Sequence, residues 1–377
     1  MSKVKLGEVA IEHKETCKGN KDGYPIVGLE HLVPEEVTLT AWDEGSDNTF
    51  TKMFRKGNVL FGRRRAYLKK AAVAPFDGIC SGDITVIEAI PDRILPELLP
   101  FIIQNDELFD FAVGKSAGSL SPRVKWEHLK NYEFELPNMD KQRELAELLW
   151  AMDATKKSYQ KLIAATDELV KSQFIERFGK PGTDPFRWGL TTLGKCCELN
   201  PRKPKGINTD DSYSFVAMPS VSEDGRIDAS VERPYSEVCK GFTYFAENDV
   251  LFAKITPCME NGKGGVAKGL KNGVGFGSTE FHVLRPIKGV SDPYWLYIIT
   301  MFSKFRSDAE KVMTGTGGQR RVPITYLSEY SITLPPIELQ EQFAVFVRQS
   351  DKSKFELEQA LSELTATYKR IIAENLG

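Results

Sequence analysis

Long apolar segments are missing from this 377-residue sequence, so we expect no membrane-spanning helix. The first ten residues, MSKVKLGEVA, lack the apolar core of a secretory signal, which favours a cytoplasmic protein. The six cysteines show no C-x-x-C spacing, and the four histidines are scattered along the chain. These spacings predict reduced thiols, no disulfide framework and no metal site.

An excess of positive charge is missing as well. The sequence contains 50 Lys and Arg residues and 52 Asp and Glu residues, which gives a net charge of −2 at pH 7. Proteins that bind polyanions over much of their surface are usually basic. The composition therefore restricts any contact with nucleic acid to local basic loops, because only the charge that faces the phosphates counts.

Familiar catalytic motifs are also absent. Gly114-Lys115-Ser116 resembles the end of a phosphate-binding loop, but Phe109 stands where that motif requires a glycine. Asp292-Pro293-Tyr294 lacks the second proline of the amino-methyltransferase motif and opens a predicted helix, and Asn200-Pro201-Arg202 fails the same comparison. We therefore predict a chain without catalytic activity, with an unrecognised enzyme as the alternative.

What the sequence does contain is an internal repeat. PRVKWEHLKNYEFELPNMDKQ at 122–142 aligns without a gap on RRVPITYLSEYSITLPPIELQ at 320–340. Arg123 then falls on Arg321, and Gln142 on Gln340. Further aligned segments are FRKGNVLFGR (54–63) with FAENDVLFAK (245–254), and GICSGDITVIEA (78–89) with GFGSTEFHVLRP (275–286). Each has a turn before an apolar or alternating strand. A short predicted helix follows, at 96–106 and at 292–302, so we predict two similar α/β (α+β) units.

Each half closes with a long amphipathic helix. After Pro137 and Pro335 the apolar period changes from two to about 3.6 residues. Such a helix of about 38 residues would be roughly 57 Å long, which is hard to bury on one small domain. We therefore expect the helices to pair as an antiparallel coiled coil, and packing of each helix on its own unit is the alternative. The predicted seam and partner-binding residues are Leu145, Leu148, Met152, Leu162, Leu169, Leu357, Leu361, Leu364, Tyr368 and Ile371.

Basic loops after the apolar strands are the first candidates for ligand binding. Arg63, Arg64 and Arg65 could bind phosphates or reach guanine edges, and the alternative is a solvated or partner-facing cluster. The remaining basic or amide residues of these loops are Lys69, Lys70, Lys254, Asn261, Lys263 and Lys268. In the second half they stand among glycines, which let a ligand approach the backbone closely; a flexible turn is the alternative.

Two loops of small residues, at 114–123 and 314–321, are the second candidates. Their hydroxyls, backbone N–H groups and cations are groups that contact phosphates, and Gln319 has the chemistry to read adenine. Arg123 and Arg321 match between the halves, so they either contact DNA or brace the loops. The other candidate residues here are Lys115, Ser119 and Arg320.

In this arrangement the sequence resembles the specificity subunit of a type I restriction–modification system. The resemblance rests on the order unit, helix, unit, helix, and on the F-x-x-[GND]-[ND]-V-L-F segments at 54–61 and 245–252. It rests also on LPPIELQEQ at 334–342, whose counterpart LPNMDKQ departs at Asn138 and Met139.

The resemblance implies target recognition domains at 1–137 and 181–335, with spacer helices at 138–180 and 336–377. Each domain would read one part of a bipartite sequence in double-stranded DNA. Two modification (methyltransferase) subunits would methylate adenine, and restriction (endonuclease/translocase) subunits would cleave or translocate DNA. S-adenosylmethionine, ATP and Mg²⁺ would bind those partners and not this chain. The alternatives are a two-lobed scaffold that does not bind DNA, and a solitary methyltransferase or nuclease.

Overall fold

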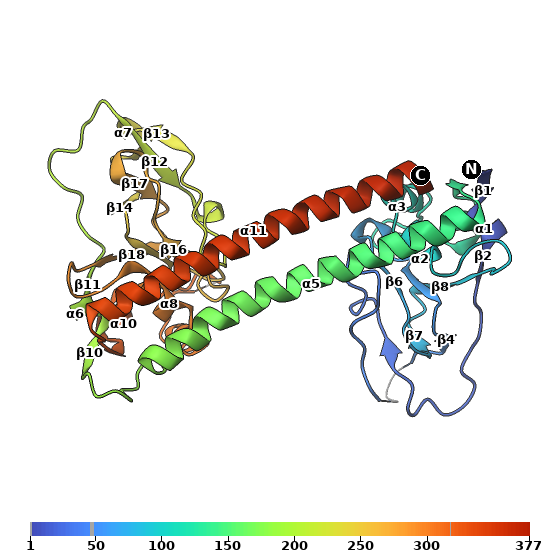
Figure 1. The fold of residues 1–377 in the computed structure, drawn as a ribbon, viewed down its shortest axis with the longest axis horizontal. Coiled ribbons are helices and arrows are strands. Elements are labelled where there is room, and N and C mark those ends of the chain that lie inside the picture. The colour runs from blue at the N-terminus through green and yellow to red at the C-terminus, as the bar shows by residue number, and fades with distance from the viewer. Residues whose placement is uncertain (1, 46–48, 317) are drawn as a thin grey trace. The chain divides into compact units, whose positions relative to one another are not determined.

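The computed structural model describes residues 2–45, 49–316 and 318–377 (Figure 1). The chain divides into two compact units. Unit 1 comprises residues up to 162 together with 357–377, and unit 2 comprises 163–356. Two helices of 40 residues, α5 (Met139–Phe178) and α11 (Ile337–Leu376), are therefore shared, because each unit contains a segment of both. None of the described helices is long and apolar enough to cross a membrane.

Unit 1 is built on a four-stranded antiparallel sheet. The strand order is β2 (Ala10–Glu12), β8 (Ile84–Ala89), β5 (Val59–Gly62) and β6 (Ala71–Val73). A three-stranded sheet has the order β3 (Ile26–Val27), β7 (Gly78–Cys80) and β4 (Lys52–Phe54), and β1 (Ser2–Lys5) pairs with β9 (Glu133–Leu136). Its helices are α1 (Leu6–Val9), the 3-10 turn η1 (Ala66–Leu68), α2 (Leu99–Ile103), α3 (Asp106–Gly114) and α4 (Trp126–Leu129).

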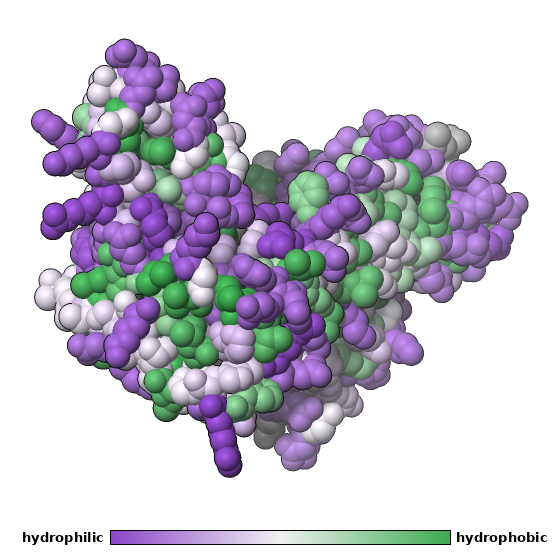
Figure 2. Space-filling view, turned by 60° about the vertical axis from the view of Figure 1, so that its left-hand side comes forward, coloured by the Kyte–Doolittle hydropathy of each residue, from purple (hydrophilic) through white to green (hydrophobic). Residues whose placement is uncertain are grey.

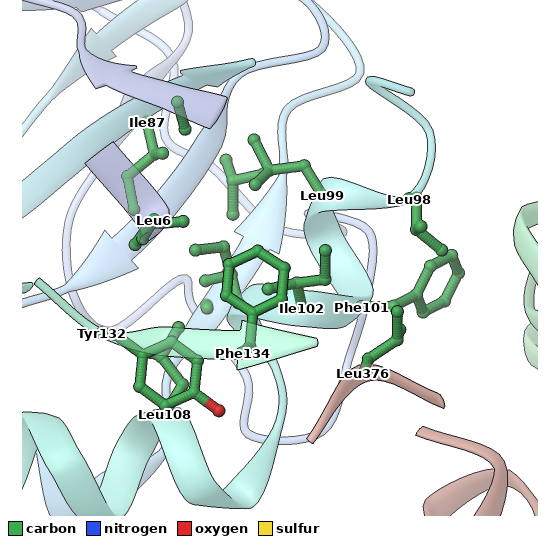
Figure 3. Close-up of a cluster of buried hydrophobic side chains, with 14 of the residues drawn as sticks. Leu6, Ile87, Leu98, Leu99, Phe101, Ile102, Leu108, Tyr132, Phe134 and Leu376 are labelled. Atoms are coloured by element: carbon green, nitrogen blue, oxygen red, sulfur yellow. The ribbon is translucent and has the colours of Figure 1, made fainter. Parts of the chain in front are cut away.

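The apolar run of β5 is explained by burial of both faces of the main sheet. Val59 and Phe61 join the core that the helices cover, whereas Leu60 points into a second core on the opposite face. Alternate residues of a strand point to opposite faces, so a strand covered on both sides needs apolar residues at every position. Figure 3 shows part of the first core, where Phe101 lies near Leu376 from the end of α11.

Unit 2 repeats this plan. Its main sheet has the order β11 (Cys197–Leu199), β18 (Phe281–Pro286), β15 (Val250–Ala253) and β16 (Gly264–Val266). The second sheet has the order β13 (Glu232–Pro234), β12 (Ser212–Val216), β17 (Val274–Gly277) and β14 (Thr243–Ala246), and β10 (Leu190–Thr192) pairs with β19 (Ser331–Thr333). Its helical elements are α6 (Leu193–Cys196), η2 (Met218–Ser220), α7 (Tyr235–Val238), η3 (Lys271–Gly273), α8 (Pro293–Met301), α9 (Ser303–Lys311) and α10 (Ile324–Glu329). The predicted duplication of an α/β (α+β) unit is confirmed, and β13 with α7 is an addition in unit 2.

The repeated glutamines tie the start of each long helix to its unit. Gln142 and Gln340 are both buried. The side-chain carbonyl of Gln142 accepts a hydrogen bond from the backbone of Leu95 (2.8 Å), and that of Gln340 accepts from Asp292 (3.0 Å). Their amide groups donate to the carbonyls of Pro137 and Pro335. Buried amides need such partners, so this pair of matched residues has a structural role.

Within each unit the segments of α5 and α11 pack against each other and run antiparallel. In unit 2, Phe174 lies 5.6 Å from Phe343 between ring centroids, and Lys354 binds Asp167 at 2.8 Å. In unit 1, Met152 and Tyr368 line a common cavity. The ends of the helices also enter the unit cores, through Leu145 and Leu149 in unit 1 for example. Pairing of the helices and packing on the units therefore occur together.

The seam of α5 differs in register from the prediction. One row of its buried and half-buried residues follows steps of four and three: Leu145, Leu149, Met152, Lys156, Tyr159, Ile163, Thr166 and Val170. Leu148, Leu162 and Leu169 were assigned to the seam, but their exposed fractions are 45%, 52% and 49%. That assignment was wrong because polar residues, among them Lys156 and Thr166, occupy the seam positions. In α11 the predicted residues Leu357, Leu361, Leu364, Tyr368 and Ile371 are half-buried.

Candidate nucleic-acid interface

Three segments of unit 1 meet where the strand β5 ends. The backbone N–H of Arg63 donates to the carbonyl of Asp83 at 3.0 Å, and Val124 N–H donates to the carbonyl of Arg63 at 3.0 Å. Arg65 N–H donates to the carbonyl of Pro122 at 2.8 Å. The arginine loop after β5, the turn before β8 and the small-residue loop are therefore held in one framework.

Unit 2 contains the same framework. Lys254 N–H donates to the carbonyl of Glu280 at 2.9 Å, Val322 N–H donates to the carbonyl of Lys254 at 2.9 Å, and Thr256 N–H donates to that of Arg320 at 3.0 Å. Lys254 thus takes the place of Arg63. The two units present different side chains on an equivalent backbone.

The matched arginines each bind a carboxylate. Arg123 donates from Nε to Asp83 at 2.6 Å and from Nη2 at 3.3 Å. Arg321 donates from Nε and Nη2 to Glu280 at 2.9 and 2.7 Å. These hydrogen bonds hold the pKa values of the Asp83 and Glu280 carboxyls below their usual range. Such paired contacts have defined geometry, so they support the interpretation that the arginines brace the loops.

Of the three consecutive arginines, Arg63 lies on a polar cleft of about 720 Å³, which Arg123, Thr16 and Thr51 also help to line. Among the residues that the structure describes, the buried Nε groups of Arg63 and Arg64 have no acceptor. Arg64 otherwise donates to Ser121 at 3.1 Å and lies 3.5 Å from Asp83. Buried donors without acceptors are costly, so the polar groups of these two arginines are not fully satisfied within unit 1.

Arg65 and Ser119 are exposed, whereas other predicted residues of unit 1 bind their own unit. Lys69 lies 2.6 Å from Asp106, and Lys70 donates to the carbonyl of Leu29 at 2.7 Å. Lys115 lies 5.7 Å above the ring of Phe111. A direct contact of these lysines with DNA stays a prediction.

In unit 2 the framework brings together Lys254, Arg320 and Arg321. Burial lowers the pKa of Lys254, and Arg320 lies 3.6 Å from Glu310 and 4.0 Å from Glu260. The local charges differ between the units, because Arg63, Arg64 and Arg123 act on the single carboxylate of Asp83 in unit 1, whereas here three cations lie near three carboxylates.

The other predicted residues of unit 2 divide into two groups. Asn261 and Gln319 are exposed, and Lys263 lies 3.4 Å from the carbonyl of Met218. Lys268 instead binds Asn248 and lines a different pocket, beside Arg285 and Tyr294, so the structure does not bring it to the framework. Part of the 314–321 loop, residue 317, lies outside the described residues.

Three functional supports were missed in the sequence. Asp83 and Glu280 precede β8 and β18 at matching places, and this match between acidic residues was the available signal. Arg306 is buried and donates to the carbonyl of Gly262 at 3.1 Å, which fixes the turn that carries Asn261. No sequence pattern links Arg306 to that turn.

The structure also explains the partial motifs. Asp292 is the N-cap of α8: its side chain accepts hydrogen bonds from the N–H groups of Tyr294 (2.8 Å) and Trp295 (3.3 Å), and Pro293 takes the first turn. Asp292-Pro293-Tyr294 is thus a helix start. The six cysteines are unpaired in the structure.

One group of three side chains has the residue types of a metal site, but its hydrogen bonds do not suit a metal. Glu30, His31 and Asp43 lie close together, but His31 Nδ1 accepts a hydrogen bond from the backbone N–H of Gly28 at 3.0 Å. Nε2 of the neutral ring then carries the proton and faces Asp43 at 3.6 Å. In a metal site, Nε2 would bind the metal and Nδ1 would donate its proton to the protein, which is the reverse of the arrangement at His31.

A family model for the type I restriction modification DNA specificity domain matches residues 1–165 and 187–365. The chain belongs to this family. Two specificity-family relatives come from Escherichia coli. The EcoAI specificity subunit is 36% identical over 201 residues, which cover 52% of this chain and 34% of the relative. The EcoEI specificity subunit is 40% identical over 159 residues, or 42% of this chain and 26% of the relative. The matched parts therefore span about a third or less of these curated relatives.

Solved structures of the specificity family share the fold over almost the whole chain. One, from work on complex assembly and conformational transition of the type I R-M system, has a TM-score of 0.57 at 21% identity and covers 99% of this chain and 97% of its own. The S subunit from M. genitalium has a TM-score of 0.56 at 12% identity, with coverage of 98% and 94%. At such identities the likeness concerns the fold.

The molecular surface of this family member carries exposed apolar residues among polar ones. Figure 2 shows small apolar patches between hydrophilic side chains on the visible face. Tyr67 and Leu68, which follow the arginine loop, are 55% and 41% exposed.

Proposed function

We propose that this chain is the specificity subunit of a type I restriction–modification complex. Its two units would each read one part of a bipartite sequence in double-stranded DNA, and the chain would position methyltransferase and restriction subunits in the cytoplasm. The chain itself would be non-catalytic, with S-adenosylmethionine, ATP and Mg²⁺ bound by the partners.

The duplicated loop framework is the observation that carries this proposal. Equivalent backbone hydrogen bonds hold Arg63 in unit 1 and Lys254 in unit 2, while the surrounding side chains differ. Direct readout of a sequence depends on side chains that reach base edges, whereas contacts to the DNA phosphates and sugars only fix the position of the protein. Two equivalent frameworks with different side chains suit a target whose two parts differ in sequence.

Comparing methylomes of a host with and without this gene would define the target. The chain, with its methyltransferase partner, should then shift a duplex of that sequence and lose affinity steeply with salt. Duplexes with either half-site scrambled should each bind more weakly. Failure to bind any duplex would favour the scaffold alternative, equal binding of all sequences would contradict sequence-specific reading, and methylation or cleavage by the chain alone would favour a solitary enzyme.

Matched variants test which unit reads which half-site. Arg65→Gln in unit 1 and Arg320→Gln in unit 2 should each weaken one half-site, because each removes a cation from the framework of one unit; Arg65 stands where unit 2 has Thr256, and Arg320 where unit 1 has Pro122. Lys161→Gln, at an exposed position of α5, is the charge-matched control and should leave both half-sites unchanged. Equal loss at both half-sites from either loop variant would contradict independent reading.

A further inference from the structure

Leu120 is the most exposed large apolar side chain among the described residues, at 90%. It lies in the small-residue loop of unit 1, between Gly118 and Ser121. Exposed leucines are common singly, so the exposure alone decides nothing. What distinguishes Leu120 is the loop that carries it and the charge beside it.

The loop is held at several points. Ala117 and Arg123 exchange two backbone hydrogen bonds, of 3.0 and 2.9 Å, which close the loop at its base. Ser121, next to Leu120, accepts from Arg64 at 3.1 Å, and Arg123 is fixed on Asp83. Gly118 has φ +116°, a value that favours glycine, and permits the sharp turn before Leu120. Leu120 is therefore presented by a braced loop.

Several arginines surround this loop. Arg64 touches the loop through Ser121, and the backbone of Arg65 binds the loop at Pro122. Arg63 and Arg123 line the adjoining cleft, together with Glu12, Glu15 and Asp83. Proteins that bend DNA insert apolar side chains, leucine among them, between neighbouring base pairs, while cations hold the flanking phosphates. A leucine presented among arginines has both parts of that arrangement.

Unit 2 differs at the matching position. Since Arg321 matches Arg123, Gly318 stands where unit 1 has Leu120, and Gln319 stands where it has Ser121. The base of this loop is also closed by paired hydrogen bonds, between Thr314 and Arg321, but they enclose one residue more than the Ala117–Arg123 pair does in unit 1. The same framework therefore presents an apolar side chain in unit 1, and a glycine followed by an amide in unit 2.

We propose that Leu120 is an apolar wedge that enters between two base pairs of the half-site read by unit 1 and unstacks them. Deformation would then contribute to specificity in this half-site, because pyrimidine–purine steps are the cheapest to open. At the other half-site Gln319 would read bases without a wedge. This inference rests on the proposed function, which supplies the DNA.

The test uses the chain with its methyltransferase partner, without S-adenosylmethionine, on duplexes carrying 2-aminopurine at successive positions outside the methylated base. We expect fluorescence to rise at one step of the unit 1 half-site and to remain low in the other. Leu120→Ser should abolish that rise and weaken binding by about tenfold or more. Leu120→Phe should retain the rise, since a phenyl ring can also unstack a step.

Leu190→Ser is the control, because Leu190 is 60% exposed in unit 2 and far from the loop in sequence. It should change neither fluorescence nor affinity. Wild-type binding without any fluorescence rise, or a rise that survives in Leu120→Ser, would overturn the wedge and leave the proposed function intact. Failure of the wild-type complex to bind any duplex would instead reject the proposed function. Loss of the methyltransferase from Leu120→Ser, with unchanged fluorescence, would make Leu120 a partner contact and overturn the wedge.

Discussion

Asp83 and Glu280 occupy matching places before β8 and β18, and each accepts two hydrogen bonds from an arginine. The sequence showed that Arg123 and Arg321 match, but left open whether they bind DNA or brace their loops. The structure supplies the carboxylates, about 40 residues away in sequence. Side-chain partners at such separations leave no periodic signal, which is why the sequence did not identify them.

Replacing Asp83 distinguishes the two roles of Arg123. If Arg123 acted directly on phosphates, Asp83→Asn would remove a repelling charge and strengthen DNA binding. A brace predicts the opposite: Asp83→Asn should weaken binding about as much as Arg123→Ala, and the double variant should be little worse than either. Duplex titration at constant salt measures this. Tighter binding by Asp83→Asn would refute the brace.

His282 gives unit 2 a pH dependence. Burial lowers the pKa of His282 to about 4, and the ring bridges Val322 (2.8 Å) and Asn200 (3.2 Å). Between about pH 6.5 and pH 4 the unfolded chain binds a proton at His282 that the folded chain does not bind. The free energy of unfolding therefore decreases as the pH is lowered through this range. The loss should approach about 3 kcal/mol near pH 4.

Urea denaturation between pH 4.5 and 7.5 tests this expectation. His282→Gln can form both hydrogen bonds but does not titrate, so its stability should decline less as the pH falls. An equal decline in wild type and variant would show that other groups control the acid sensitivity.

At the scale of elements, the sequence predicted the long helices and the duplicated strands, because their periods of 3.6 and two are strong signals. Part of the predicted seam of α5 lies one residue before the observed seam, at Leu148 instead of Leu149. Both are leucines, so hydropathy alone did not separate them. The polar seam residues Lys156 and Thr166 concealed the true register.

The adjacent leucines provide a test of that register. Leu149→Ala should lower the free energy of unfolding of unit 1 by about 2–5 kcal/mol, because Leu149 is fully buried in its core. Leu148→Ala, one residue earlier and 45% exposed, should cost less than about 0.5 kcal/mol. Equilibrium urea denaturation of both variants measures the difference. Similar losses of unfolding free energy in the two variants would support Leu148 as a seam residue.

At the scale of the molecule, the two long helices suit a proposed role in setting the spacing of the half-sites. Inserting seven residues after Leu162 in α5 and seven after Glu356 in α11 would lengthen each helix by about 10.5 Å and keep the heptad phase. We expect the preferred spacer to grow by about three base pairs, at about 3.4 Å each, with both half-sites unchanged. Methylome sequencing of a strain with this variant gives the result. Changed half-sites would refute the ruler role, and insertion into α5 alone serves as a mismatched control.

The sharing of α11 between the units has a consequence for the order in which the protein can fold. Ile372 and Leu376 complete the core of unit 1, and Asn105 donates a hydrogen bond to the carbonyl of Leu376 at 3.2 Å. During synthesis on the ribosome, most of unit 1 is therefore made before unit 2 but lacks part of its core until α11 has been made. Nascent unit 1 should remain sensitive to protease until α11 arrives, which makes premature termination in α11 harmful to the unit that was made earlier.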